Sequence, residues 1–162
     1  MARQIYKVIS EFVNESLKDI FNDKPESRRK WMWSLDDHTR IWLLYKSCSM
    51  FLVPERLNLF HPDYLRNKVH QAYNVQKLTV LPPNAEEVYK ECQLTDRNGT
   101  ELIRWQTKLG EKCYMELSLF KMLQKYSDYD EDAQIFYEGY RFFLVEDGQV
   151  TSVILGVRTH DD

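Results

Sequence analysis

Apolar residues near the start of the chain recur every three or four positions, which is the spacing of one face of a helix. The stripe consists of Ile5, Val8, Ile9, Phe12, Val13, Leu17, Ile20 and Phe21. It predicts a first helix that ends near Asn22, because Lys24 precedes Pro25 and a residue before proline disfavours helical geometry.

Three more helices are predicted from helix start and stop signals. Ser34 followed by Asp37 resembles a capping box, so a helix is expected over residues 34–52. A proline at the first position favours another helix over residues 62–72. The last helix is expected over residues 111–126, with methionine, leucine and tyrosine side chains on its apolar side.

The dipeptide Asn98-Gly99 predicts a β-hairpin, because both residues tolerate positive φ in a two-residue turn. The register that follows pairs Leu94 with Ile103, Cys92 with Trp105, and Asp96 with Glu101. The first two pairs place four apolar side chains on one face. The third pair places two like charges opposite each other, which is unfavourable.

The dipeptide Asp147-Gly148 predicts a second hairpin for the same reason. One face, expected to meet the core, consists of Tyr140, Phe142, Leu144, Val153 and Leu155. The other face is too apolar to be left to water, so a helix covers it or a partner binds it. We interpret this second face as a binding surface made of Phe143, Val145, Val150, Ile154 and Arg141.

Together these elements predict an α+β fold, with about four helices packed on an antiparallel sheet built from the two hairpins. The length of 162 residues is typical of one domain, and apolar residues at 43% are sufficient for its core. We therefore expect a single globular domain over residues 1–162.

Charge and cysteine content narrow the classes of function. A formal net charge of −3 argues against general nucleic-acid binding, which requires a basic face. The three cysteines are odd in number and form no CxxC motif, so reduced thiols in the cytoplasm are expected. No apolar run approaches the length of a membrane span or resembles a signal peptide, so we expect a soluble protein without membrane partners.

Acidic residues give weak signals for a metal. Asp128, Asp130 and Asp132 alternate like the first ligands of a calcium loop, but Ala133 stands where the loop requires glycine. The run Asp36, Asp37 and His38 fits the first turn of a helix equally well. We therefore expect no metal and no other cofactor.

A catalytic role would require acid, base or nucleophilic side chains that lie close together in space, and the candidates for these are spread along the sequence. A small hydrolase or nuclease is one hypothesis, with His38, Asp63, Arg66 and His70 as candidate residues if they converge in a cleft. Cys113 is predicted near a helix start, where the dipole lowers a thiol pKa, but a packed thiol is the simpler interpretation. No coherent catalytic set emerges from these residues.

Positive and aromatic side chains alternate in one further segment, made of Arg28, Arg29, Lys30, Trp31 and Trp33. The aromatic rings of such a patch can stack on the bases of single-stranded nucleic acid, and its positive charges can neutralise the phosphates. The alternative is a solvated loop that its tryptophans anchor to the core, and we prefer this alternative because tryptophan is usually well buried.

The chain is rich in tyrosine and tryptophan, residues enriched at binding hot spots. The leading hypothesis is a protein that acts by binding another macromolecule, in the manner of an inhibitor, an immunity protein or a viral accessory protein. Its partner is expected to be another protein or a second copy of itself. A hydrolase and a nucleic-acid binder remain the alternatives.

Overall fold

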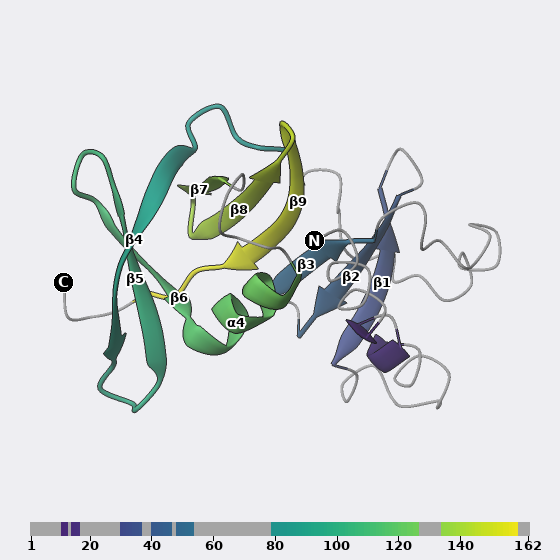
Figure 1. Ribbon diagram of the computed structural model, residues 1–162, viewed down its shortest axis with the longest axis horizontal. Helices are drawn as coiled ribbons and strands as arrows, with labels where there is room; N and C mark the ends of the chain where they lie inside the picture. Colours follow the sequence, from purple (N-terminus) through teal and green to yellow (C-terminus); the bar gives the residue numbers. More distant parts are fainter. Residues whose placement is uncertain are drawn as a thin grey trace. The chain divides into compact units, whose positions relative to one another are not determined.

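A computed structural model describes residues 11–12, 14–16, 30–36, 40–46, 48–53, 79–126 and 134–158 (Figure 1). The chain divides into two compact units, Met1–Val80 and Leu81–Asp162, called unit 1 and unit 2 below. The predicted helix over residues 62–72 lies outside the described residues. The expectation of a single domain stays a prediction, which a cooperative unfolding transition would test.

Unit 1 contains a three-stranded antiparallel sheet in the order β1-β2-β3. The strands are β1 (Trp31–Leu35), β2 (Ile41–Tyr45) and β3 (Ser49–Leu52). Leu43 in the central strand lies opposite Trp33 on one side and Phe51 on the other. All three of these side chains are buried.

The sheet of unit 1 shows that the helix predicted over residues 34–52 is wrong. The predicted apolar positions fit a helical stripe, but Ile41 to Leu44 are consecutive and all buried. A short continuous apolar run is also typical of a strand that is buried on both faces. Asp36 precedes a chain reversal instead of opening a helix, and its backbone N–H donates to the carbonyl of Arg40 at 3.1 Å.

Helical residues in unit 1 occur at 11–12 and 14–16, within the predicted first helix. Phe12 packs against the sheet, with ring centroids 5.2 Å from Trp31 and 5.3 Å from Phe51. Tyr45 extends this aromatic cluster, at 4.8 Å from Trp31. The rest of the predicted helix over residues 5–21 lies outside the described residues.

The described residues of unit 2 form six antiparallel strands in the order β9-β8-β7-β4-β5-β6. Its elements are β4 (Glu86–Thr95), β5 (Glu101–Thr107), β6 (Lys112–Glu116), α4 (Leu117–Tyr126), β7 (Gln134–Glu138), β8 (Arg141–Glu146) and β9 (Gln149–Leu155). The long strand β4 pairs with β7 at Glu86 and Glu87 and with β5 from Val88 onward, with an irregularity between Lys90 and Cys92. One strand therefore joins two smaller sheets.

The two ends of this strand order meet, because the chain after β9 returns to β6. Val157 forms a bridge with Tyr114, and its N–H donates to the Tyr114 carbonyl at 2.9 Å. Figure 1 shows the yellow end of β9 running on towards β6. The segment after β9 thus contacts β6 at this one point and partly covers the outer edge of β6.

Gly156 makes this contact possible. A Cβ atom built there would lie 3.2 Å from the Tyr140 carbonyl oxygen, 3.2 Å from Phe142 Cε2 and 3.3 Å from the Tyr114 carbonyl oxygen. The residue has no side chain, so two neighbouring backbones approach it closely. The glycine therefore occupies the point where β8 and β6 approach the same segment.

The first predicted hairpin is confirmed, but its predicted register is wrong by one residue. Thr95 lies opposite Glu101, and the Asp96 N–H donates to the Thr100 carbonyl, so the loop has three residues. Within this loop Gly99 adopts positive φ, at +82°, whereas Asn98 does not. This geometry is a type I turn followed by a left-handed glycine, and it adds one residue to the predicted two-residue turn.

The shift also removes the unfavourable charge pair. Asp96 leaves the strand, and its carboxylate accepts hydrogen bonds of 2.9 Å from the backbone N–H groups of Asn98 and Thr100. Leu94 now lies opposite Leu102, while Ile103 and Trp105 are on the other face. A one-residue slip exchanges the two faces of a strand, so the predicted apolar grouping of this hairpin is wrong as well.

The second predicted hairpin is confirmed at its turn, where Asp147 and Gly148 both have positive φ. The predicted register holds for the pair Val145 with Val150 and then shifts at a bulge after Leu144. The shift carries Leu155 opposite Arg141 instead of Tyr140. Bulges of this kind have no sequence signature in this chain.

The helix predicted over residues 111–126 is half right. Its first part is the strand β6, in which Cys113 and Met115 are buried, and α4 begins only at Leu117. Both parts carry apolar residues, so periodicity over the whole segment did not separate them. Phe120 of α4 packs edge-on against Trp105 of β5, with ring centroids 5.7 Å apart, and both rings are buried in the core of unit 2.

The α+β fold class with about four helices is therefore wrong. The described residues contain nine strands, every described pairing is antiparallel, and helix is confined to two short segments. Among the described residues, no helix is long and apolar enough to cross a membrane.

Candidate functional site

The predicted binding face of the second hairpin is enclosed in the structure. Phe143 and Ile154 are each 1% exposed, and Val145 and Val150 are also buried. Only Arg141 of the predicted set is exposed. Buried side chains do not reach a partner without a rearrangement of the fold, so a docking surface has to be sought elsewhere.

The predicted nucleic-acid segment also directs its aromatic rings inward. Trp31 and Trp33 are 2% exposed, and their indole N–H groups donate to Glu15 and Ser16. Lys30 is exposed. Arg28 and Arg29 lie outside the described residues. The tryptophans anchor this segment to the core, so they do not offer stacking surfaces to nucleic acid.

Cys113 is a packed thiol in a strand, 2% exposed, and not a helix-activated nucleophile. Its thiol faces the Trp105 carbonyl at 3.7 Å. Burial, and secondarily the charge of Glu111, raises the pKa of Cys113 to about 12. A thiol with such a pKa stays protonated at neutral pH and is a poor nucleophile.

The other candidate catalytic and metal-binding residues lie largely outside the described residues. These are Asp37, His38, Asp63, Arg66, His70, Asp128, Asp130 and Asp132. The hydrolase hypothesis therefore stays a prediction. Among the residues that the structure does describe, no group of three metal-binding side chains occurs.

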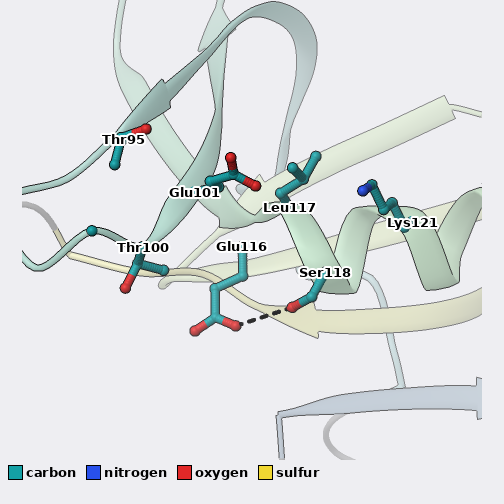
Figure 2. A pocket seen from close by; sticks show the side chains of 8 residues that line it. Thr95, Thr100, Glu101, Glu116, Leu117, Ser118 and Lys121 are labelled. Carbon is teal, nitrogen blue, oxygen red and sulfur yellow. Dashed lines mark hydrogen bonds between the residues drawn. The ribbon is translucent and has the colours of Figure 1, made fainter.

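A pocket of about 430 Å³ lies in unit 2 between the β4–β5 turn and the start of α4 (Figure 2). Its lining residues are Thr95, Gly99, Thr100, Glu101, Glu116, Leu117, Ser118 and Lys121. Figure 2 shows two carboxylates in this lining, and the hydroxyl of Ser118 donates to Glu116 at 3.4 Å.

The lining of this pocket is mostly polar and charged. Its volume is in the range of small-molecule sites, but such sites are mostly apolar, and Leu117 is the one large apolar residue of this lining. Among the described residues Ser118 has no histidine partner, and all four histidines lie outside this part of the chain. The residues present do not form an activated nucleophile.

A second candidate site is an exposed surface around the start of β8. It consists of Tyr140, Arg141, Leu155 and Arg158, and is called the Tyr140 surface below. Tyr140 and Leu155 are 42% and 46% exposed, and both arginines are exposed as well. Arg141 and Leu155 are paired across β8 and β9.

The ring of Tyr140 is held in a defined position. The guanidinium carbon of Arg158 lies 4.3 Å from the ring centroid, which is a cation–π contact. Tyr137 packs edge-on against the same ring at 6.5 Å. The Gly156 N–H donates to the Tyr140 carbonyl at 2.6 Å, so the segment after β9 fixes this turn.

Tyr140 has an uncommon backbone conformation, with φ at +63°. It is the second residue of a two-residue turn after Gly139, a position that favours glycine. Positive φ is unusual for a bulky residue and costs about 1–3 kcal/mol. Such strained positions are concentrated at functional sites, so the ring is a candidate for a functional role.

The neighbouring Tyr137 is an unreactive phenol. Burial, followed by the nearby Cys113, Tyr140 and Glu111, raises the pKa of Tyr137 well above its ordinary value, and a hydrogen bond with the Tyr140 backbone only partly offsets this rise. Tyr137 therefore stays a neutral hydrogen-bonding group that supports the Tyr140 ring.

Sequence reasoning placed Tyr140 and Leu155 on the face that meets the core, and this placement is wrong. The bulge after Leu144 moves Leu155 outward, and the turn removes Tyr140 from the strand. A signal was present in Gly139 followed by an aromatic residue, between Glu138 and Arg141, which is consistent with a two-residue turn.

Comparison with known proteins gives no relative: no family model, no curated protein and no solved structure matches this chain.

Proposed function

We propose that the protein acts by binding another protein and that the Tyr140 surface is where the partner docks. The observation that carries this proposal is the exposed ring of Tyr140, which is stacked by Arg158 and held at positive φ. Tyrosine and arginine are two of the three residue types most enriched at binding hot spots.

The fixed geometry supports binding because it lowers the entropy cost of association. Ordering a mobile side chain at an interface costs about 0.5–1.5 kcal/mol. The ring of Tyr140 already contacts Tyr137 and Arg158, so much of that cost is met in the free protein. Leu155 adds exposed apolar area beside it.

The strain at Tyr140 gives a test that separates function from folding. Glycine is the favoured residue at φ +63°, so Tyr140→Gly should relax the turn. We expect the free energy of unfolding to stay within about 1 kcal/mol of the wild-type value, since relief of strain offsets the lost ring contacts. Binding, in contrast, should be lost.

The experiment compares partner capture by the purified wild-type protein, Tyr140→Gly and a control variant. Leu109→Ala is a matched control, because Leu109 is 87% exposed in the β5–β6 turn and far more accessible than Tyr140. Partners are captured from the native host and identified by mass spectrometry. A partner retained by the wild type and by Leu109→Ala, but lost from Tyr140→Gly, supports the proposal. Equal capture by all three proteins contradicts it.

A further inference from the structure

We infer that the Tyr140 surface recognises an acidic segment of its partner protein, with the carboxylates of that segment bound by Arg141 and Arg158. This inference rests on the proposed function and deepens it by naming the chemistry of the partner. Its first basis is charge. The whole chain carries a net charge of −3, yet Arg141 and Arg158 at this surface outnumber their one acidic neighbour in the pairing, Glu138, which lies opposite Arg141 in β7.

The second basis is the kind of cation. Arginine has a planar guanidinium with several N–H donors that match the two oxygens of a carboxylate, and it stays charged at all physiological pH values. The guanidinium carbon of Arg158 lies over the Tyr140 ring, and a cation–π contact of this kind does not use the N–H donors of the guanidinium as hydrogen-bond donors to oxygen. Stacking therefore orients the group and leaves it able to bind an anion.

The third basis is the local arrangement of these side chains. Arg141 follows Tyr140 in sequence and lies between Leu155 of β9 and Glu138 of β7, so apolar and cationic groups adjoin at the start of β8. An acidic segment that also carries apolar residues would complement both kinds of group. Single-stranded nucleic acid offers anions and stacking bases as well, and the experiment is designed to detect it.

The probe is a short fluorescent peptide of alternating glutamate and serine, measured by fluorescence anisotropy. A lysine–serine peptide and an oligothymidylate of equal length serve as the other probes. We expect the glutamate peptide to bind the wild type, the lysine peptide not to bind, and oligothymidylate to bind more weakly than the glutamate peptide. Binding should weaken as sodium chloride rises from about 50 to 500 mM, because salt screens exposed charges.

Variants assign the binding to the two arginines. Arg141→Ala with Arg158→Ala should weaken binding of the glutamate peptide by at least about tenfold, the size expected for losing charged hydrogen bonds. The control is Lys108→Ala with Lys112→Ala, which removes the same charge from two exposed lysines at the β5–β6 turn. This control should retain most of the wild-type affinity. Arg158→Lys keeps the charge but loses the planar donors, and should lie between the two.

Three results would overturn the inference: no binding of the glutamate peptide, equal weakening in the arginine and lysine double variants, or tighter binding of oligothymidylate. Failure of the inference differs visibly from failure of the proposed function. A native partner that is lost from Tyr140→Gly but retained by the arginine double variant leaves the docking surface in place and rejects an acidic partner segment.

Discussion

Both units hold a chain reversal with an aspartate carboxylate, but only unit 2 also uses glycine in its turns. All five glycines of the sequence lie in unit 2, and four of them adopt positive φ in turns. Unit 1 contains no glycine, and its described chain reversals use ordinary residues. Lys46 adopts positive φ after β2, and Asp36 accepts hydrogen bonds across the reversal between β1 and β2.

This difference determines where each unit is vulnerable. A glycine turn depends on backbone freedom, so its loss costs a local amount of strain. A turn held by a buried carboxylate depends on several hydrogen bonds at once, so its loss leaves several donors without partners. Asp36 binds the Arg40 backbone, the Arg40 side chain and the Trp42 indole, at 2.9, 2.7 and 3.0 Å. We therefore expect unit 1 to be more sensitive to one substitution than unit 2.

The largest effect is expected for Asp36→Ala. Its side chain is only 3% exposed, and removing it should destabilise the protein by about 2–3 kcal/mol, because the indole of Trp42 loses its acceptor. Three of the four tryptophans lie in unit 1, so a denaturant titration followed by tryptophan fluorescence is a sensitive measurement. A midpoint unchanged from the wild type would show that the carboxylate is dispensable.

The pH dependence of stability sharpens this prediction. Burial acts to raise the pKa of Asp36, but hydrogen bonds from Trp42 and from the Arg40 backbone and side chain, with the charge of Arg40, outweigh it and lower the pKa. Stability from a lowered carboxyl pKa is present above the ordinary value of 3.8 and is lost as pH falls through the folded-state pKa. As the pH falls below about 4, the free energy of unfolding of Asp36→Asn should therefore decrease less than that of the wild type.

The second-largest destabilisation is expected for Gly156→Ala. The added methyl group would lie 3.2–3.3 Å from atoms of Tyr140, Phe142 and Tyr114, so the segment after β9 has to move. Overpacking of this kind should cost about 1–3 kcal/mol in unit 2. Urea titrations give the change in unfolding free energy, and amide exchange at Val157 reports the opening of its bridge to Tyr114. Unchanged exchange there would contradict the close packing.

Gly99→Ala is the matched substitution without crowding. Nothing lies within 4 Å of a Cβ built at this position, so the expected loss of about 1 kcal/mol comes only from backbone strain at φ +82°. The same thermal or denaturant measurement applies to both glycine variants. If Gly99→Ala were the more harmful of the two, strain rather than crowding would dominate, and the role assigned to Gly156 would be wrong.

The smallest expected effect concerns the reactivity of the cysteine thiols in the two units, which should differ without any change in stability. Cys113 should resist a thiol reagent in the folded protein, because it is 2% exposed and its pKa is raised to about 12. Cys92 and Cys48 are only partly covered and should react first. Mass spectrometry after labelling at about pH 8 distinguishes the three sites. Early labelling of Cys113 would show that β6 opens far more readily than its pairing with β5 indicates.

The location of the hairpin turns could be predicted from sequence, because Asn98-Gly99 and Asp147-Gly148 have a backbone requirement that few residues meet. The turn from Thr107 to Glu111 has the same hydrogen-bond pattern as the turn at Asp96, with Gly110 in the left-handed region. Its Leu109-Gly110 dipeptide lacks the asparagine or aspartate before glycine that marks the other two turns. The helix predicted over residues 111–126 therefore began one strand too early.

The strands of unit 1 could not be predicted in the same way. Their reversals carry no glycine, and the long-range contacts that favour strands, such as Leu43 between Trp33 and Phe51, are invisible to local periodicity. The Tyr140 surface was missed for a related reason. Its exposure depends on a bulge after Leu144, which shifts one strand by a single residue and changes which side chains face outward.

The most direct test of the Tyr140 surface is hydrogen exchange of the protein with and without its captured partner. We expect amide exchange to slow at residues 139–141 and 155–158, since these segments carry the exposed ring, both arginines and Leu155. Exchange around the β4–β5 turn and in unit 1 should stay unchanged. Protection confined to those other regions, with residues 139–141 exchanging as in the free protein, would contradict docking at the Tyr140 surface.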